Sequence, residues 1–235
     1  GDVYNRQVWN LVLVIFGVYA AFSLFQSNTG KGKVISAVVL VGVAGVLYLM
    51  YQNTPAETAV SAPIFQQFNP FFVVALTPVS LAFFGMLAKR NAEPSAPKKI
   101  GLGMLIAAIG FLVIAAGSNG LLTPNAQAAG IAAGEDVTRV SANWLVSTYL
   151  VLTFAELFLS PMGISFVSKV APPKMKGMMM GGWFVATAIG NMLTVVPAMI
   201  WGDQNLIIVW GLLIGLCLVS AVFIFAILKK LEKVC

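Results

Sequence analysis

Residues 143–168 read NWLVSTYLVLTFAELFLSPMGISFVS, an apolar run long enough to cross a bilayer as a helix. Glu156 lies near the middle of this run. The other seven acidic residues fall in predicted loops or at the chain ends, and none of the fourteen Lys and Arg residues lies inside an apolar run. A charge at bilayer depth costs about 2.5–3.5 kcal/mol, so it normally faces a helix-bundle interior or a water-filled cavity. We therefore predict that Glu156 belongs to a functional site, with a helix-packing role as the alternative.

Helical spacing places a set of polar and small residues of this run on one stripe: Tyr149, Thr153, Glu156, Ser160 and Gly163. The other faces carry Leu, Val, Ile and Phe, which suit lipid or neighbouring helices. Pro161 cannot donate a hydrogen bond to the carbonyl of Leu157, so a kink or a loosened turn is predicted beside the carboxylate.

The composition indicates an all-α polytopic membrane protein. Hydrophobic residues make up 59% of the chain and charged residues only 9%, against roughly 25% charged in ordinary soluble domains. Seven spans are predicted, at about 8–25, 34–51, 67–88, 100–117, 143–168, 179–200 and 205–228. Residues 118–142 are predicted to form a long external connection, and residues 90–99 a stiff turn.

Several classes of chemistry are disfavoured by what the sequence contains. The chain has no His, and Cys217 and Cys235 form neither a disulfide framework nor a metal-ligand spacing. It also has no HExxH, no Gly-x-Ser-x-Gly and no second acid within a span. We expect no catalytic residue and no metal site, so the protein is predicted not to be an enzyme.

The basic residues lie in alternate connections between the predicted spans. Twelve of the fourteen fall in one set of connections and the C-terminal tail: Lys31, Lys33, Lys89, Arg90, Lys98, Lys99, Lys169, Lys174, Lys176, Lys229, Lys230 and Lys233. The positive-inside rule makes this set cytoplasmic, with the N-terminus outside and the C-terminus inside. The net charge of +6 is thus topological, and nucleic acid is not an expected partner. An outside N-terminus without a signal peptide predicts a piece cut from a larger chain, with an authentic seven-span protein as the alternative.

Two further patterns flank the predicted site. Asn69-Pro70 opens the third span and is either a polar ligand at the outer part of the membrane or an ordinary helix start. In the sixth span, small residues recur at every fourth position and predict close helix packing: Gly182, Ala186, Gly190 and Thr194. Trp183, Thr187 and Asn191 share an adjacent face, which either lines a cavity or packs in the core.

Three segments together resemble the C-terminal half of the proton-dependent oligopeptide transporter family. They are residues 156–163 (ELFLSPMG), 168–172 (SKVAP) and 177–184 (GMMMGGWF). Residues 68–72 (FNPFF) resemble the start of the family's eighth core helix. The resemblance runs from about Phe65 to the end of the chain and covers the eighth to the twelfth core helices.

The resemblance implies a major-facilitator fold, in which two six-helix halves surround a central cavity and import di- and tripeptides with protons. Glu156 and Asn69 would then receive the peptide's amino terminus, and Ser160 and Trp183 would line the same pocket. Pro161 and Gly182 would lie in the two helices that close the cytoplasmic side. The implied partners are small peptides, protons, the lipid bilayer and an N-terminal half. No cofactor is expected beyond the proton gradient across the cytoplasmic (inner) membrane.

The sequence departs from the family pattern in its first part. The N-terminal half and the seventh core helix are absent, and residues 1–60 are interpreted as an extra helix hairpin before a five-helix bundle of residues 61–235. A diverged seventh helix within the first pair is the alternative. Two other functions stay open: transport of another small solute such as nitrate, or a non-catalytic membrane scaffold.

Overall fold

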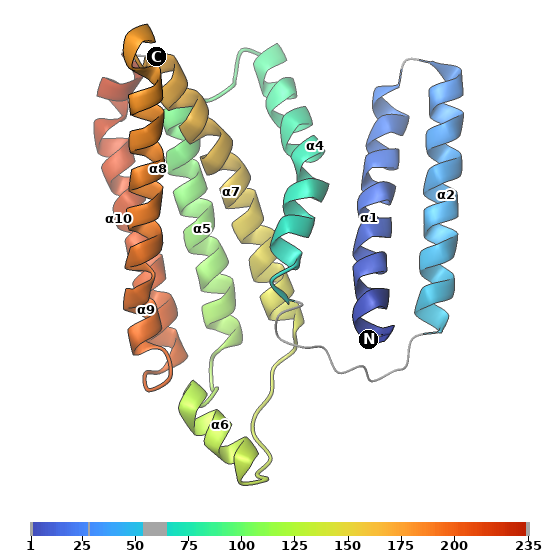
Figure 1. The fold of residues 1–235 in the computed structure, drawn as a ribbon, viewed down its shortest axis with the longest axis vertical. Helices are drawn as coiled ribbons and strands as arrows, with labels where there is room; N and C mark the ends of the chain where they lie inside the picture. Colours follow the sequence, from blue (N-terminus) through green and yellow to red (C-terminus); the bar gives the residue numbers. More distant parts are fainter. Residues whose placement is uncertain (1, 28, 54–64, 234–235) are drawn as a thin grey trace. The chain divides into compact units, whose positions relative to one another are not determined.

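The computed structural model describes residues 2–27, 29–53 and 65–233, and side chains from Trp9 onward except Leu11 (Figure 1). Every regular element in these ranges is helical, and no strand occurs in them. The elements are α1 (Asp2–Gln26), α2 (Gly30–Gln52), α4 (Phe68–Lys89), α5 (Ala96–Gly117), α6 (Pro124–Ala132), α7 (Asn143–Val170), η1 (Pro173–Met175), α8 (Lys176–Leu193), α9 (Val195–Ile200) and α10 (Leu206–Glu232). The predicted all-α class is confirmed.

The predicted spans are found as helices within a few residues of their expected bounds. Six stretches of the described chain are long and apolar enough to cross a membrane, namely α2, α4, α5, α7, the combined stretch Pro173–Ile200, and α10. The first predicted span lies in α1, which holds a shorter apolar stretch, Val12–Gln26.

Packing divides the chain into two compact units, Gly1–Asn91 and Ala92–Cys235. In the first unit, α1 and α2 pack along each other, and α4 also contacts α1. A hydrogen bond from the Ser36 hydroxyl to the Ser23 hydroxyl, 2.9 Å long, joins the two helices of the hairpin. The predicted boundary after residue 60 falls within residues 54–64, outside the described residues, and stays a prediction.

The second unit is organised around α5, which packs against α7 on one side and α10 on the other (Figure 1). Glycines at a spacing of seven let α7 approach the α5 backbone. A Cβ at Gly103 would lie 3.0 Å from the Ala155 carbonyl oxygen, and one at Gly110 would lie 2.8 Å from the Leu152 side chain. Two residues before Gly103, a Cβ at Gly101 would lie 2.9 Å from the Phe225 ring of α10. Small residues at helix interfaces permit such close backbone approach in membranes.

The predicted long connection at residues 118–142 contains the nine-residue helix α6. Thr123 caps this helix by accepting a hydrogen bond from the Ala126 backbone N–H at 3.4 Å, and Pro124 stands in its first turn. These are two standard helix-start signals. The helix is also tied to the α9–α10 turn, since the Asn125 backbone N–H donates to the Gly202 carbonyl at 3.1 Å and its side-chain amide to Asp203 at 2.7 Å.

The sixth predicted span is not one continuous helix. It separates at Thr194 into α8 and α9. Pro197 has no N–H to donate to the carbonyl of Leu193, which leaves the helical ladder open at this point. At the same point, the Thr194 hydroxyl donates a hydrogen bond to the Asn191 carbonyl at 2.6 Å.

The two ends of the second unit differ in charge. Ser95 at the start of α5 donates a hydrogen bond to Glu232 at the end of α10, so these two helix ends meet. Lys98, Lys229 and Lys230 lie at these helix ends, and Lys169 lies in the last turn of α7. The opposite end carries three acidic residues, Glu135, Asp136 and Asp203, and one basic residue, Arg139. This segregation agrees with a single basic face toward one side of a membrane.

Candidate functional site

The polar stripe predicted on α7 divides into a buried part and an exposed part. Thr153 and Gly163 are buried, and the Thr153 hydroxyl donates to the Tyr149 carbonyl at 2.7 Å. Glu156 and Ser160 are both exposed and lie one helical turn apart. The stripe therefore lies at the edge of the packed face of α7. Thr153 and Gly163 are packed inside the unit, whereas Glu156 and Ser160 form the open side of the helix.

Glu156 stands at the middle of α7, about 20 Å from either helix end at 1.5 Å rise per residue. Its neighbours Ala155 and Leu157 are buried, and Ala155 packs against Gly103 of α5. In the described part of the chain, no side chain pairs with the Glu156 carboxylate. A charge at this depth is costly against lipid. The open side of α7 is thus chemically suited to a polar ligand or a water-filled cavity rather than to acyl chains.

Trp183 brings α8 onto this edge of α7. A Cβ at Gly163 would overlap the Trp183 indole ring, so the glycine leaves the space that the ring fills. Trp183 itself is half-buried. The structure therefore places Trp183 beside the stripe that also carries Glu156 and Ser160, where α8 contacts α7.

The remaining predicted residues are placed as follows. Pro161 is exposed inside α7, which stays helical from Asn143 to Val170. Gly182 is exposed inside α8, and the interruption of this span comes at Thr194 rather than at Gly182. Asn69 lies in the first turn of α4, which belongs to the first unit. The roles given to these three residues stay predictions.

The small-residue stripe of α8 has no helix against it in the second unit. A Cβ at Gly182 or at Gly190 would meet no atom within 4 Å, and none of the apolar window of Pro173–Ile200 is buried. The predicted packing thus does not occur within this unit. Large apolar side chains on the same helix are exposed as well: Met178, Phe184, Val185, Ile189, Met192 and Leu193.

Among the residues that the structure describes, no three His, Cys, Asp or Glu side chains come together in a way that could hold a metal ion. The chain has no His at all.

Two features of the second unit were not predicted from the sequence. The Trp183–Gly163 contact joins positions twenty apart, and only the glycine's place on the polar stripe pointed to it. Lys99 was assigned to a basic connection, but it is buried in the first turn of α5 and paired with Glu93. Pro97, a residue favoured in a first helical turn, lies two positions before Lys99 and was the available signal.

Gly163→Ala is expected to destabilise the protein by about 1–3 kcal/mol, because the added methyl group must displace the indole of Trp183. The loss should nearly vanish in a Trp183→Leu background, which a double-mutant cycle on thermal or denaturant unfolding measures. Gly182→Ala is the matched control, since its methyl group would enter open space. An equal loss from Gly163→Ala in both backgrounds would contradict the contact.

Comparisons with known proteins identify the family of this chain. A model of the POT family matches residues 33–206. "Dipeptide and tripeptide permease B" of Salmonella typhimurium is 28% identical over 217 residues, covering 81% of this chain and 40% of the permease. "Peptide transporter YePEPT" of Yersinia enterocolitica is 36% identical over 128 residues, covering 54% of this chain and 23% of that protein.

Solved structures show the same fold. A crystal structure of a peptide transporter POT in complex with sulfate aligns with a TM-score of 0.64 at 21% identity, covering all of this chain and 48% of the transporter. This chain spans about two fifths of the length of the permease that it matches over 217 residues. Because the family model matches well over half of the sequence, the chain belongs to the POT family, the proton-dependent oligopeptide transporters.

Proposed function

We propose that this chain is the C-terminal part of a symporter that moves di- and tripeptides together with protons. Its family consists of transporters rather than enzymes, and several relatives are named as dipeptide and tripeptide permeases. The observation that carries the proposal is the exposed Glu156 carboxylate at mid-span, on the edge of α7 that Trp183 joins.

In this proposal Glu156 pairs with the ammonium group at the peptide's amino terminus. Charge-assisted hydrogen bonds are about twice as strong as neutral ones, so the amine is held mainly by this residue. Ser160, one turn further on the same open side, contributes a neutral hydrogen bond, and the Trp183 indole supplies an apolar wall. The side-chain amide of Asn69 is a second contact to the peptide's amino terminus, beside Glu156. A proton on Glu156 would cancel its charge and release the amine, which links the proton to the peptide.

A second half of the transporter is proposed to cover the open side of α7 and α8. Support comes from the exposed apolar side chains of α8, the unpaired mid-span carboxylate and the two-fifths coverage of the permease. Pro161 and Gly182 are proposed to let these two helices bend when the cytoplasmic side closes. Alternating access in such transporters is a rocking of one helix bundle against another around a shared site.

The transporter is proposed to lie in the cytoplasmic (inner) membrane with the basic end of the second unit inside. Single-cysteine labelling, in a background free of Cys217 and Cys235, tests this orientation. Lys98→Cys should be shielded from a membrane-impermeant reagent in intact cells, and Glu135→Cys should react. Labelling of position 98 from outside the cell would show that the proposed orientation is reversed.

Counterflow with labelled dipeptides, run on the full-length protein in proteoliposomes, tests the substrate class. Exchange should require unlabelled di- or tripeptide inside the vesicles. Nitrate is not expected to exchange, because an exposed carboxylate at the site repels an anion. Exchange of nitrate without exchange of dipeptide would replace the peptide proposal with transport of another solute.

A further inference from the structure

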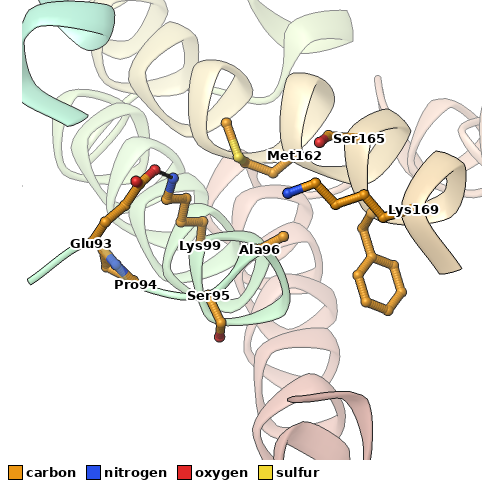
Figure 2. A pocket seen from close by; sticks show the side chains of 9 residues that line it. Glu93, Pro94, Ser95, Ala96, Lys99, Met162, Ser165 and Lys169 are labelled. Atoms are coloured by element: carbon orange, nitrogen blue, oxygen red, sulfur yellow. Dashed lines mark hydrogen bonds and ion pairs between the residues drawn. The ribbon is translucent and has the colours of Figure 1, made fainter. Parts of the chain in front are cut away.

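A group of charged side chains lines a cavity away from Glu156, at the basic end of the second unit. The cavity has a volume of about 370 Å³ and sits between the start of α5 and the last turns of α7 (Figure 2). It is lined by the segment before α5 and by side chains of both helices: Glu93, Pro94, Ser95, Ala96, Lys99, Met162, Ser165, Phe166 and Lys169.

Two ammonium groups face one carboxylate in this cavity. Lys99 is only 3% exposed, and its amine is paired with Glu93. Lys169 extends its amine toward this pair from α7, as Figure 2 shows. Among the described residues no acidic side chain pairs with Lys169. One positive charge is therefore left over, and a single anionic group would balance it.

The position of the cavity along the helices indicates which kind of molecule supplies this anionic group. Ala96 begins one candidate span, and Lys169 stands one residue before the end of another. The cavity thus lies at the level where spans meet the membrane surface, which is the level of lipid headgroups. Basic pockets between helices on the cytoplasmic side are suited to lipid headgroups. Met162 and Phe166 add an apolar wall on the α7 side, suited to the start of an acyl chain.

We propose that this cavity binds the phosphodiester headgroup of an anionic membrane phospholipid. The phosphate lies between the amines of Lys169 and Lys99 and shares Lys99 with the Glu93 carboxylate. The Ser165 hydroxyl donates a further hydrogen bond to a phosphate oxygen. The bound lipid holds the segment before α5 against the end of α7, away from the peptide site.

Native mass spectrometry of the full-length protein, delipidated and then supplied with one lipid at a time, tests the site. Phosphatidylglycerol should be retained in preference to phosphatidylcholine, whose headgroup carries no net charge. Lys169→Gln should weaken phosphatidylglycerol retention roughly tenfold, the usual effect of losing one charge-assisted hydrogen bond. Ser165→Ala should weaken it less. Lys99 is left unchanged in the test, because removing a buried charged partner endangers folding.

Lys174→Gln is the matched control, since Lys174 is exposed five residues after Lys169 but does not line the cavity. It should retain phosphatidylglycerol as the parent protein does. Equal losses from the two variants would mean a diffuse surface effect and would overturn the site. If inorganic phosphate binds in a way that depends on Lys169 and no lipid is preferred, the cavity is a site for free phosphate. That result would overturn the proposal of lipid binding. No peptide or proton gradient enters the measurement, so it is independent of the proposed transport.

Discussion

Glu156→Gln is expected to abolish proton-coupled dipeptide uptake by the full-length protein and to weaken binding of free dipeptides roughly ten- to a hundredfold. Glutamine keeps nearly the shape of glutamate, and residue 156 is exposed on α7, so the helix should remain folded. The substitution removes one charge-assisted interaction with the peptide's ammonium group, worth about 1.5–3 kcal/mol. Each 1.4 kcal/mol corresponds to about tenfold in affinity. Calorimetric titration with the same dipeptides measures the change.

The controls separate charge pairing from general damage to the site. Peptides with a blocked amino terminus lack the ammonium group, so Glu156→Gln should change their binding much less. Ser160→Ala removes only a neutral hydrogen bond from the same open side of α7 and should cost about 0.5–1.5 kcal/mol. If a folded Glu156→Gln variant binds free dipeptides as tightly as the parent, Glu156 serves helix packing rather than the peptide amine.

The helices could be predicted from the sequence because hydropathy and length alone define a membrane span. Six of the seven predicted spans each correspond to one helix, and the sixth corresponds to α8 and α9. The exposure of Glu156 agrees with a mid-span charge that avoids the packed interface. Such charges are rare enough to stand out in a single sequence.

Features that depend on contacts between distant residues could not be predicted in this way. The separation of α8 from α9 comes at Thr194, and Pro197 alone did not fix its place because proline within a span is tolerated. Hydropathy places a lysine outside the spans, yet Lys99 is buried because Glu93 pairs with it. Close approach at Gly103 follows from the Ala155 carbonyl on another helix, which no local pattern contains.

Residues 1–235 alone, reconstituted in proteoliposomes, are expected to accumulate no dipeptide under a proton gradient. In the described part of the second unit, no side chain pairs with Glu156, and large apolar side chains of α8 such as Phe184 and Met192 are exposed. A site open on one side cannot be presented to the two membrane faces in turn, because alternating access needs a second bundle. The full-length protein, reconstituted in parallel, is the positive control for the assay.

The same open side predicts opposite effects of one substitution in the two proteins. In the isolated chain no described side chain pairs with Glu156. Glu156→Leu should therefore raise stability by up to about 2.5–3.5 kcal/mol, the cost of a charge at mid-span. In the full-length protein the carboxylate faces a polar cavity, so Glu156→Leu should bring little gain in stability while uptake is lost. Thermal unfolding in lipid nanodiscs measures both. Uptake by the isolated chain that depends on Glu156 would show that these helices form a complete site without a second half.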